Sequence, residues 1–111
     1  MIDKIKDENI DYLFKCILKL ENEEECYRFF SDLCTIAEIK EMSKRILAAK
    51  RLKDNSVYSS IVSETGLSSA TISRVNRALK YGNDGYTLVL DRMENENEWT
   101  VFGNIAVLRA S

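Results

Sequence analysis

The 111-residue sequence contains no histidine and no proline, and only four glycines. Without histidine, a zinc site would depend on cysteine and carboxylate ligands, and a cysteine nucleophile would lack its usual base. Without proline, long helices can run uninterrupted, and a turn-dense β-sandwich is disfavoured. These absences argue against an enzyme and are compatible with long helices, and a length of 111 residues is enough for one small domain.

Long apolar runs are also missing from the sequence. No stretch approaches 18 consecutive apolar residues, so we expect no membrane span. The first residues, MIDKIKDENID, alternate in charge and differ from a signal peptide. Cys16, Cys26 and Cys34 form an odd number without C-x-x-C spacing, which indicates reduced, mostly buried thiols in a cytoplasmic protein.

Charge is unevenly distributed, although the formal net charge is only -2. Residues 1–38 contain five Lys/Arg against ten Asp/Glu, residues 39–83 contain nine against three, and residues 84–111 contain two against five. The three balances are -5, +6 and -3, which sum to -2. The basic middle segment therefore says more about partners than the whole-chain charge does.

Apolar residues at three- and four-residue steps predict helices along most of the chain. The first helix is expected from about Lys4 to Leu20, and a short second helix is expected after the acidic run ENEEE. The segment TIAE, residues 35–38, has the spacing of a capping box. It predicts the start of a long third helix that continues to about Lys53.

The C-terminal part is expected to change character. Asp84 can cap a last short helix from Gly85 to about Met93. Several apolar residues beyond it favour extended structure: Trp99, Val101, Phe102, Ile105, Val107 and Leu108. We therefore divide the chain into a helical domain, residues 1–93 with about six helices, and a C-terminal extension, residues 94–111.

Two short helices joined by a glycine-containing turn are predicted over about residues 57–80. Three residues of the first helix are expected to face inward: Tyr58, Ile61 and Val62. Gly66 can end that helix in the left-handed conformation, and Ser68 can cap the second, which runs from Ser69 to Lys80. Gly82 is expected to end it. This arrangement is typical of a helix-turn-helix motif.

The second of these helices has the features of a recognition helix. Its inward residues are expected to be Ile72, Val75 and Leu79, and no acidic residue occurs from Thr65 to Asn83. The residues predicted to contact DNA through their hydroxyl or guanidinium groups are Ser68, Ser69, Thr71, Arg74 and Arg77. Candidates for phosphate contact are Lys50, Arg51, Lys53 and Lys80. The plainer alternative is that these cations form an ordinary solvated helix face.

The segment TGLSSATISRVNRALKYGNDGY resembles the tryptophan repressor family, and most closely its Trp-repressor-like branch in Gram-positive bacteria. The resemblance extends over roughly Ile10 to Met93. It implies an all-helical, intertwined homodimer that presents two helix-turn-helix heads to one palindromic operator in double-stranded DNA, and hence a transcriptional repressor. The alternative is a helical protein-interaction module without specific DNA binding.

The resemblance also implies a small-molecule corepressor site formed by Thr35, Arg45 and Arg74. Two neighbouring positions depart from the family pattern, since Val75 stands where the family has glycine and Ala78 where it has serine. Valine fills the space that a flat indole needs, and alanine cannot accept a hydrogen bond from the ligand. We therefore expect another small ligand, or none, in place of L-tryptophan. The alternative roles are a helix cap for Thr35 and surface or DNA-facing cations for the two arginines.

Overall fold

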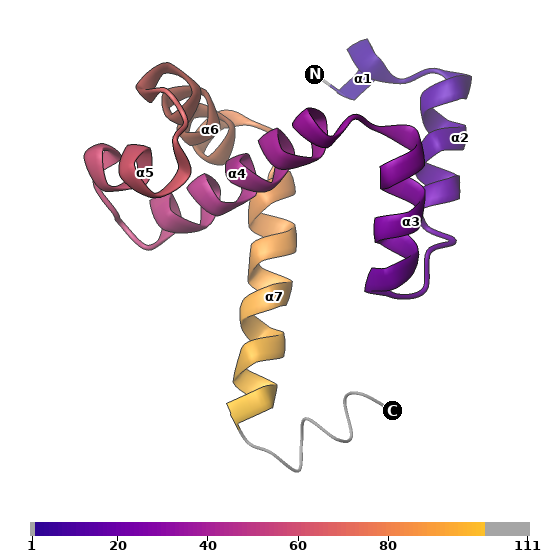
Figure 1. Ribbon diagram of the computed structural model, residues 1–111. Coiled ribbons are helices and arrows are strands. Elements are labelled where there is room, and N and C mark those ends of the chain that lie inside the picture. The colour runs from indigo at the N-terminus through magenta and orange to yellow at the C-terminus, as the bar shows by residue number, and fades with distance from the viewer. Residues whose placement is uncertain (1, 102–111) are drawn as a thin grey trace. The chain divides into compact units, whose positions relative to one another are not determined.

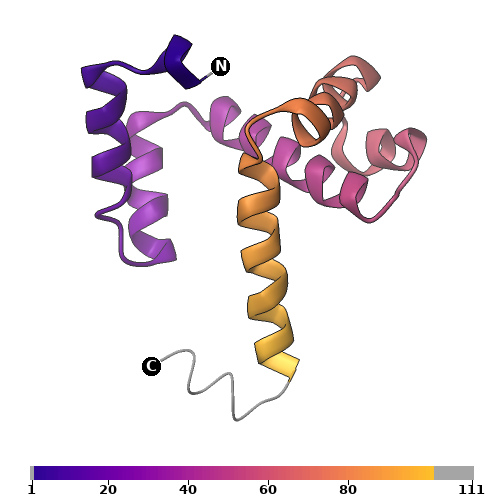
Figure 2. The ribbon, with the colours of Figure 1, turned by 180° about the vertical axis from the view of Figure 1, so that it is seen from behind.

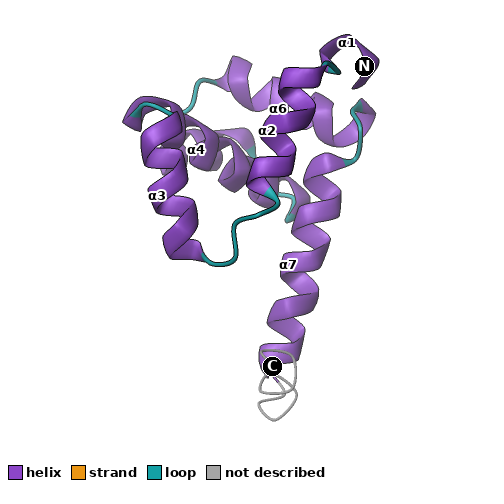
Figure 3. Cartoon of the chain, turned by 90° about the vertical axis from the view of Figure 1, so that its right-hand side faces the viewer, coloured by secondary structure: helices purple, strands orange, loops and turns teal. Residues whose placement is uncertain are grey.

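A computed structural model describes the backbone of residues 2–101 and the side chains of residues 2–96. All regular structure in this part of the chain is helical (Figures 1 and 3). The helices are α1 (Ile2–Ile5), α2 (Glu8–Ile17), α3 (Glu23–Leu33), α4 (Ile36–Lys53), α5 (Tyr58–Thr65), α6 (Ser69–Tyr81) and α7 (Gly85–Val101). None of the described helices is long and apolar enough to cross a membrane.

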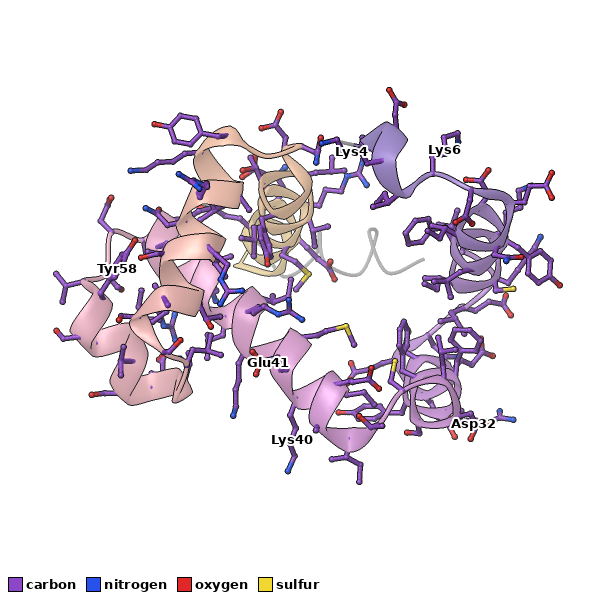
Figure 4. The ribbon with its side chains drawn as sticks, turned by 90° about the horizontal axis from the view of Figure 1, so that it is seen from above. Lys4, Lys6, Asp32, Lys40, Glu41 and Tyr58 are labelled. Atoms are coloured by element: carbon purple, nitrogen blue, oxygen red, sulfur yellow. The ribbon has the colours of Figure 1, made fainter. Side chains whose placement is uncertain are left out.

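The chain divides into two compact units, Met1–Leu47 and Ala48–Ser111. In the first unit the expected single helix from Lys4 to Leu20 is wrong, because α1 and α2 are separate. Figure 4 labels Lys4 within α1 and Lys6 in the link that follows it. The helix is interrupted because the side chain of Asp7 accepts a hydrogen bond from the amide of Ile10 at 2.8 Å and so starts α2.

Side-chain caps also start the next two helices. The side chain of Asn22 accepts from the amide of Glu25 at 2.9 Å, which begins α3. The capping box predicted before α4 is confirmed. The amide of Glu38 donates to the Thr35 hydroxyl at 3.1 Å, and the amide of Thr35 donates to the Glu38 carboxylate at 2.8 Å. The backbone hydrogen bond from Thr35 lowers the pKa of Glu38 below its usual value.

The second unit contains the buried core of the described residues. Its buried hydrophobic residues are Ala48, Ala49, Ile61, Leu67, Ile72 and Val75. The two alanines of α4 are fully buried, and such small side chains allow a close approach by the neighbouring helices. The expected inward direction of Ile61, Ile72 and Val75 is confirmed, whereas Val62 is 37% exposed and does not face the core.

The last helix is longer than expected. Figure 2 shows α7 from behind as one continuous helix, and it ends at Val101 instead of near Met93. Extended structure at Trp99 and Val101 is therefore wrong, while the expectation for residues 102–111 lies outside the described part. The physical reason is that no glycine or proline follows Gly85 until Gly103, so nothing stops the helix at Met93. The division into residues 1–93 and 94–111 stays a prediction.

Gly66 and Gly82 end α5 and α6 for different reasons. Gly66 has φ +75° and an added Cβ would meet nothing within 4 Å, so only its backbone conformation requires glycine. Gly82 has φ -85°, and an added Cβ would lie 2.5 Å from the carbonyl oxygen of Ala78. Close packing on the end of α6, and not a left-handed backbone, therefore requires glycine at Gly82.

We expect Gly66→Ala to lower the free energy of unfolding by about 1–2 kcal/mol, because alanine is strained in the left-handed conformation. Gly85→Ala is the matched control, since Gly85 also has open space around its Cα but no positive φ. That variant should be neutral or more stable by about 0.4–1 kcal/mol. Urea unfolding of both variants measures the difference, and equal effects would contradict the assigned role of Gly66.

Candidate nucleic-acid interface

The turn from α5 to α6 is closed by buried hydrogen bonds. Thr65 is 6% exposed, and its hydroxyl donates to the carbonyl oxygen of Ile61 at 2.7 Å and accepts from the amide of Leu67 at 3.1 Å. The amide of Gly66 donates to the carbonyl oxygen of Val62 at 2.8 Å. Every polar group named here has a partner, so the two helices are joined by a well-defined turn.

Ser68 caps α6, as the sequence predicts. Its hydroxyl oxygen accepts from the amide of Thr71 at 3.1 Å and also donates to the Thr71 hydroxyl at 3.0 Å. Ser68 and Ser69 are exposed, whereas Thr71 is half-buried. The hydroxyls of Ser68 and Thr71 thus already bond to each other, while Ser69 stands exposed beside them at the start of α6.

Three cations of α6 are exposed and unpaired. Arg74, Arg77 and Lys80 have no ion pair among the described residues, and α6 itself contains no acidic residue. The opposite side of the helix is buried through Ile72 and Val75. The packing of α6 therefore turns a row of positive charge toward the solvent.

The outward side of α6 and the start of α5 line an open groove of about 480 Å³. The residues that line it are Tyr58, Ser73, Arg74, Asn76, Arg77, Lys80 and Tyr81. It brings together three predicted DNA-contact residues and four residues that the prediction missed. Ser73 and Asn76 could have been found from their spacing next to the cations on α6, but no local pattern reveals Tyr58, which comes from another helix.

The cations near the end of α4 are in a different situation. Arg51 Nε lies 2.7 Å from Glu64 Oε1, and Arg51 Nη1 lies 3.9 Å from Asp54 Oδ2. Lys53 Nζ lies 2.6 Å from Asp91 Oδ1 on α7. The negative charges of these carboxylates partly neutralise Arg51 and Lys53, which the sequence analysis predicts as phosphate contacts. Lys50 is exposed and has no ion pair among the described residues, although its charge also helps to lower the pKa of Glu64.

The Arg51–Glu64 pair shifts both pKa values. The hydrogen bond from Arg51 holds the pKa of Glu64 below its usual value, and the same bond raises the pKa of Arg51. Both side chains are partly exposed, at 35% and 39%, so the solvent weakens the pair. Arg51 remains charged at any ordinary pH, and the pair therefore depends on the ionisation of Glu64.

The residues implied for a corepressor belong to both units. Thr35 and Arg45 lie in the first unit, where Thr35 caps α4 and Arg45 is exposed, and Arg74 lies in the second. Val75 is 3% exposed and belongs to the core of the second unit, at the position where the resemblance implies a glycine. Ala78 has no hydroxyl, and the expectation that L-tryptophan does not bind stays a prediction.

Two helices joined by a tight glycine turn, the second with an outward cationic face, define a helix-turn-helix protein. The family model described as Trp repressor protein matches residues 8–94. The chain belongs to the Trp repressor family, and the resemblance drawn from its sequence is confirmed.

Relatives of the chain come from Gram-positive bacteria. It is 52% identical over 98 residues to the uncharacterised protein YerC of Bacillus subtilis, a match that covers 87% of this chain and 94% of YerC. The chain is also 52% identical to a Staphylococcus aureus protein whose crystal structure is described as that of a Trp repressor. This match has a TM-score of 0.81 and covers 85% of this chain and 94% of the S. aureus chain. A TrpR like protein from Eubacterium eligens has 48% identity and a TM-score of 0.80, with coverage of 83% and 95%.

The Arg51–Glu64 pair predicts a pH-dependent stability. The pKa of Glu64 is lowered in the folded protein, so its contribution is present above the ordinary value of 4.5 and is lost as the pH falls through the lowered pKa. We expect wild-type stability to fall more steeply below pH 4.5 than that of Glu64→Gln. Urea unfolding at several pH values measures this, with Glu94→Gln on α7 as the control. Parallel curves for wild type and Glu64→Gln would show that the pair has no such effect.

Proposed function

We propose that this chain is a sequence-specific DNA-binding transcriptional regulator, a cytoplasmic repressor that acts as a homodimer on a palindromic operator. The observation that carries the proposal is the outward face of α6. Its three cations have no carboxylate partner among the described residues, and they lie on the second helix of a helix-turn-helix. Membership of the Trp repressor family supports the same class of function.

A homodimer is supported by the surface of the first unit. Helices α1, α2 and α3 have no buried residue. Their large exposed apolar side chains include Ile2, Ile5, Tyr12, Phe14, Tyr27 and Leu33, each at least half exposed. Complete burial of a fully exposed apolar side chain contributes about 1.5–3 kcal/mol, and covering these partly exposed side chains would contribute a fraction of that for each. In dimers of helix-turn-helix proteins the recognition helices lie one turn of DNA apart, roughly 34–36 Å, and we expect this spacing for two α6 helices.

A helical protein-interaction module is the second candidate. It is favoured by the excess of acidic residues in residues 1–38 and by the same exposed apolar surface, which a different protein could cover. The salt dependence of binding separates the two candidates, because DNA binding weakens steeply with salt as counterions return to the phosphates.

The direct test is selection of bound sites from random and genomic DNA with the purified protein, with and without L-tryptophan. We expect a palindromic consensus that does not change when L-tryptophan is added, and an affinity that falls as the salt concentration rises. A consensus with two half-sites would also indicate that the protein binds DNA as a homodimer. If no fragment is bound at low salt, the interaction module becomes the better explanation.

Arg74→Ala tests the face of α6 that reads the operator. We expect it to weaken operator binding by roughly 1–3 kcal/mol and to relax the preference at one base pair. Lys50→Ala is the matched variant, since Lys50 is also an exposed, unpaired cation but lies on α4, and it should weaken all sequences alike. Fluorescence anisotropy with single-base-pair operator variants measures both effects. Unchanged affinity in Arg74→Ala would show that the recognition face lies elsewhere.

A further inference from the structure

Tyr58 is held in place at the edge of the groove. It is the first residue of α5, and its half-buried ring packs against the core cluster of Ala48, Ile61, Leu67 and Ile72. Figure 4 labels it beside the helices of the second unit. Its hydroxyl has no hydrogen-bond partner among the described residues. No described side-chain polar atom is both buried and unpaired, so this hydroxyl must be accessible to solvent.

The groove that Tyr58 enters is suited to a polyanion. It is lined by three cations and two tyrosines and contains no carboxylate. From Arg74 to Lys80 the cations extend about 9 Å along the axis of α6, at 1.5 Å for each residue. A row of this length offers charge to more than one phosphate, and phenol and guanidinium groups are good donors to phosphate oxygens.

Phosphate esters could come from free nucleotides or from a nucleic-acid strand. A site for a small molecule normally surrounds most of its ligand. Here Tyr81 is 82% exposed and the three cations are exposed as well, so the groove cannot enclose a nucleotide. A long backbone that passes along α6 needs no such enclosure. The shape of the groove therefore favours a DNA strand over a free nucleotide.

We infer that this groove seats the sugar–phosphate backbone of one DNA strand, and that the hydroxyl of Tyr58 donates a hydrogen bond to a phosphate oxygen there. The inference rests on the proposed function and deepens it. It divides α6 into a start that faces the bases, up to Arg74 at the N-terminal end of the groove, and a second half, with Arg77 and Lys80, that holds the backbone. Tyr58 adds a contact from α5, so both helices of the motif fix the register on DNA.

Tyr58→Phe keeps the ring that packs on the core and removes only the hydroxyl. We expect about tenfold weaker binding to the operator and to a scrambled duplex alike, because one hydrogen bond to a charged group is lost. The slope of log K against log salt should not change, whereas Lys80→Gln should reduce its size by about 0.9. Tyr86→Phe on α7 and Lys19→Gln after α2 are the matched controls, and we expect both to bind as wild type does.

Ethylation interference adds a readout that a purely structural role of Tyr58 would not change. Ethylation of certain phosphates should block binding of the wild type. We expect one of these phosphates to have no such effect on Tyr58→Phe. It should be the same phosphate as, or the neighbour of, one whose ethylation has no effect on Lys80→Gln. Wild-type affinity and an unchanged footprint in Tyr58→Phe would overturn this inference alone. Failure of the wild type to bind any DNA would overturn the proposed function with it. Binding of ATP as tight as that of the duplex, weakened in Tyr58→Phe, would overturn the assignment to a DNA strand.

Discussion

The buried hydroxyl of Thr65 forms hydrogen bonds with both the carbonyl oxygen of Ile61 and the amide of Leu67. Gly66, between Thr65 and Leu67, adopts a left-handed backbone conformation. These bonds set the path of the chain from α5 into α6. With that path set, Ile61 and Ile72 meet in one core, and the other side of α6 must face the solvent. The position of each cation on α6 depends on this turn, since a rotation of α6 would bury charge and expose apolar side chains.

Electrostatic pairing divides the basic middle of the chain into two groups. On α4, Arg51 and Lys53 are matched by Glu64 and Asp91, and these pairs link α4 to α5 and to α7. On α6, the cations face a surface without carboxylates, so their charge is available to a partner. The same residue types therefore contribute to structure in one place and to the proposed DNA-binding face in the other, and the difference lies in which acids the fold brings near.

Burial is as unequal as charge. All six buried hydrophobic residues of the described chain belong to the second unit, and α1 to α3 contribute none. Amphipathic helices in water gain most of their stability from packing of the apolar face. The first unit thus has the pattern of an element that completes its core against another chain, which is the physical basis for the homodimer proposed above.

Local chemistry alone determined much of this protein. The capping box at Thr35 and Glu38, the glycine turn at Gly66 and the cap at Ser68 involve residues close in sequence, so their residue types were enough to predict α4, α5 and α6. The break at Asp7 escaped prediction because a capping side chain competes there with a continuous helix. The continuation of α7 past Met93 escaped prediction because residues that favour strands follow Met93 without any glycine or proline to stop the helix. Only the tertiary structure decided which cations are paired, as Lys53 and Asp91 lie 38 residues apart. It also brought Tyr58 to the cations of α6, because a groove between two helices exists only after both have packed on one core.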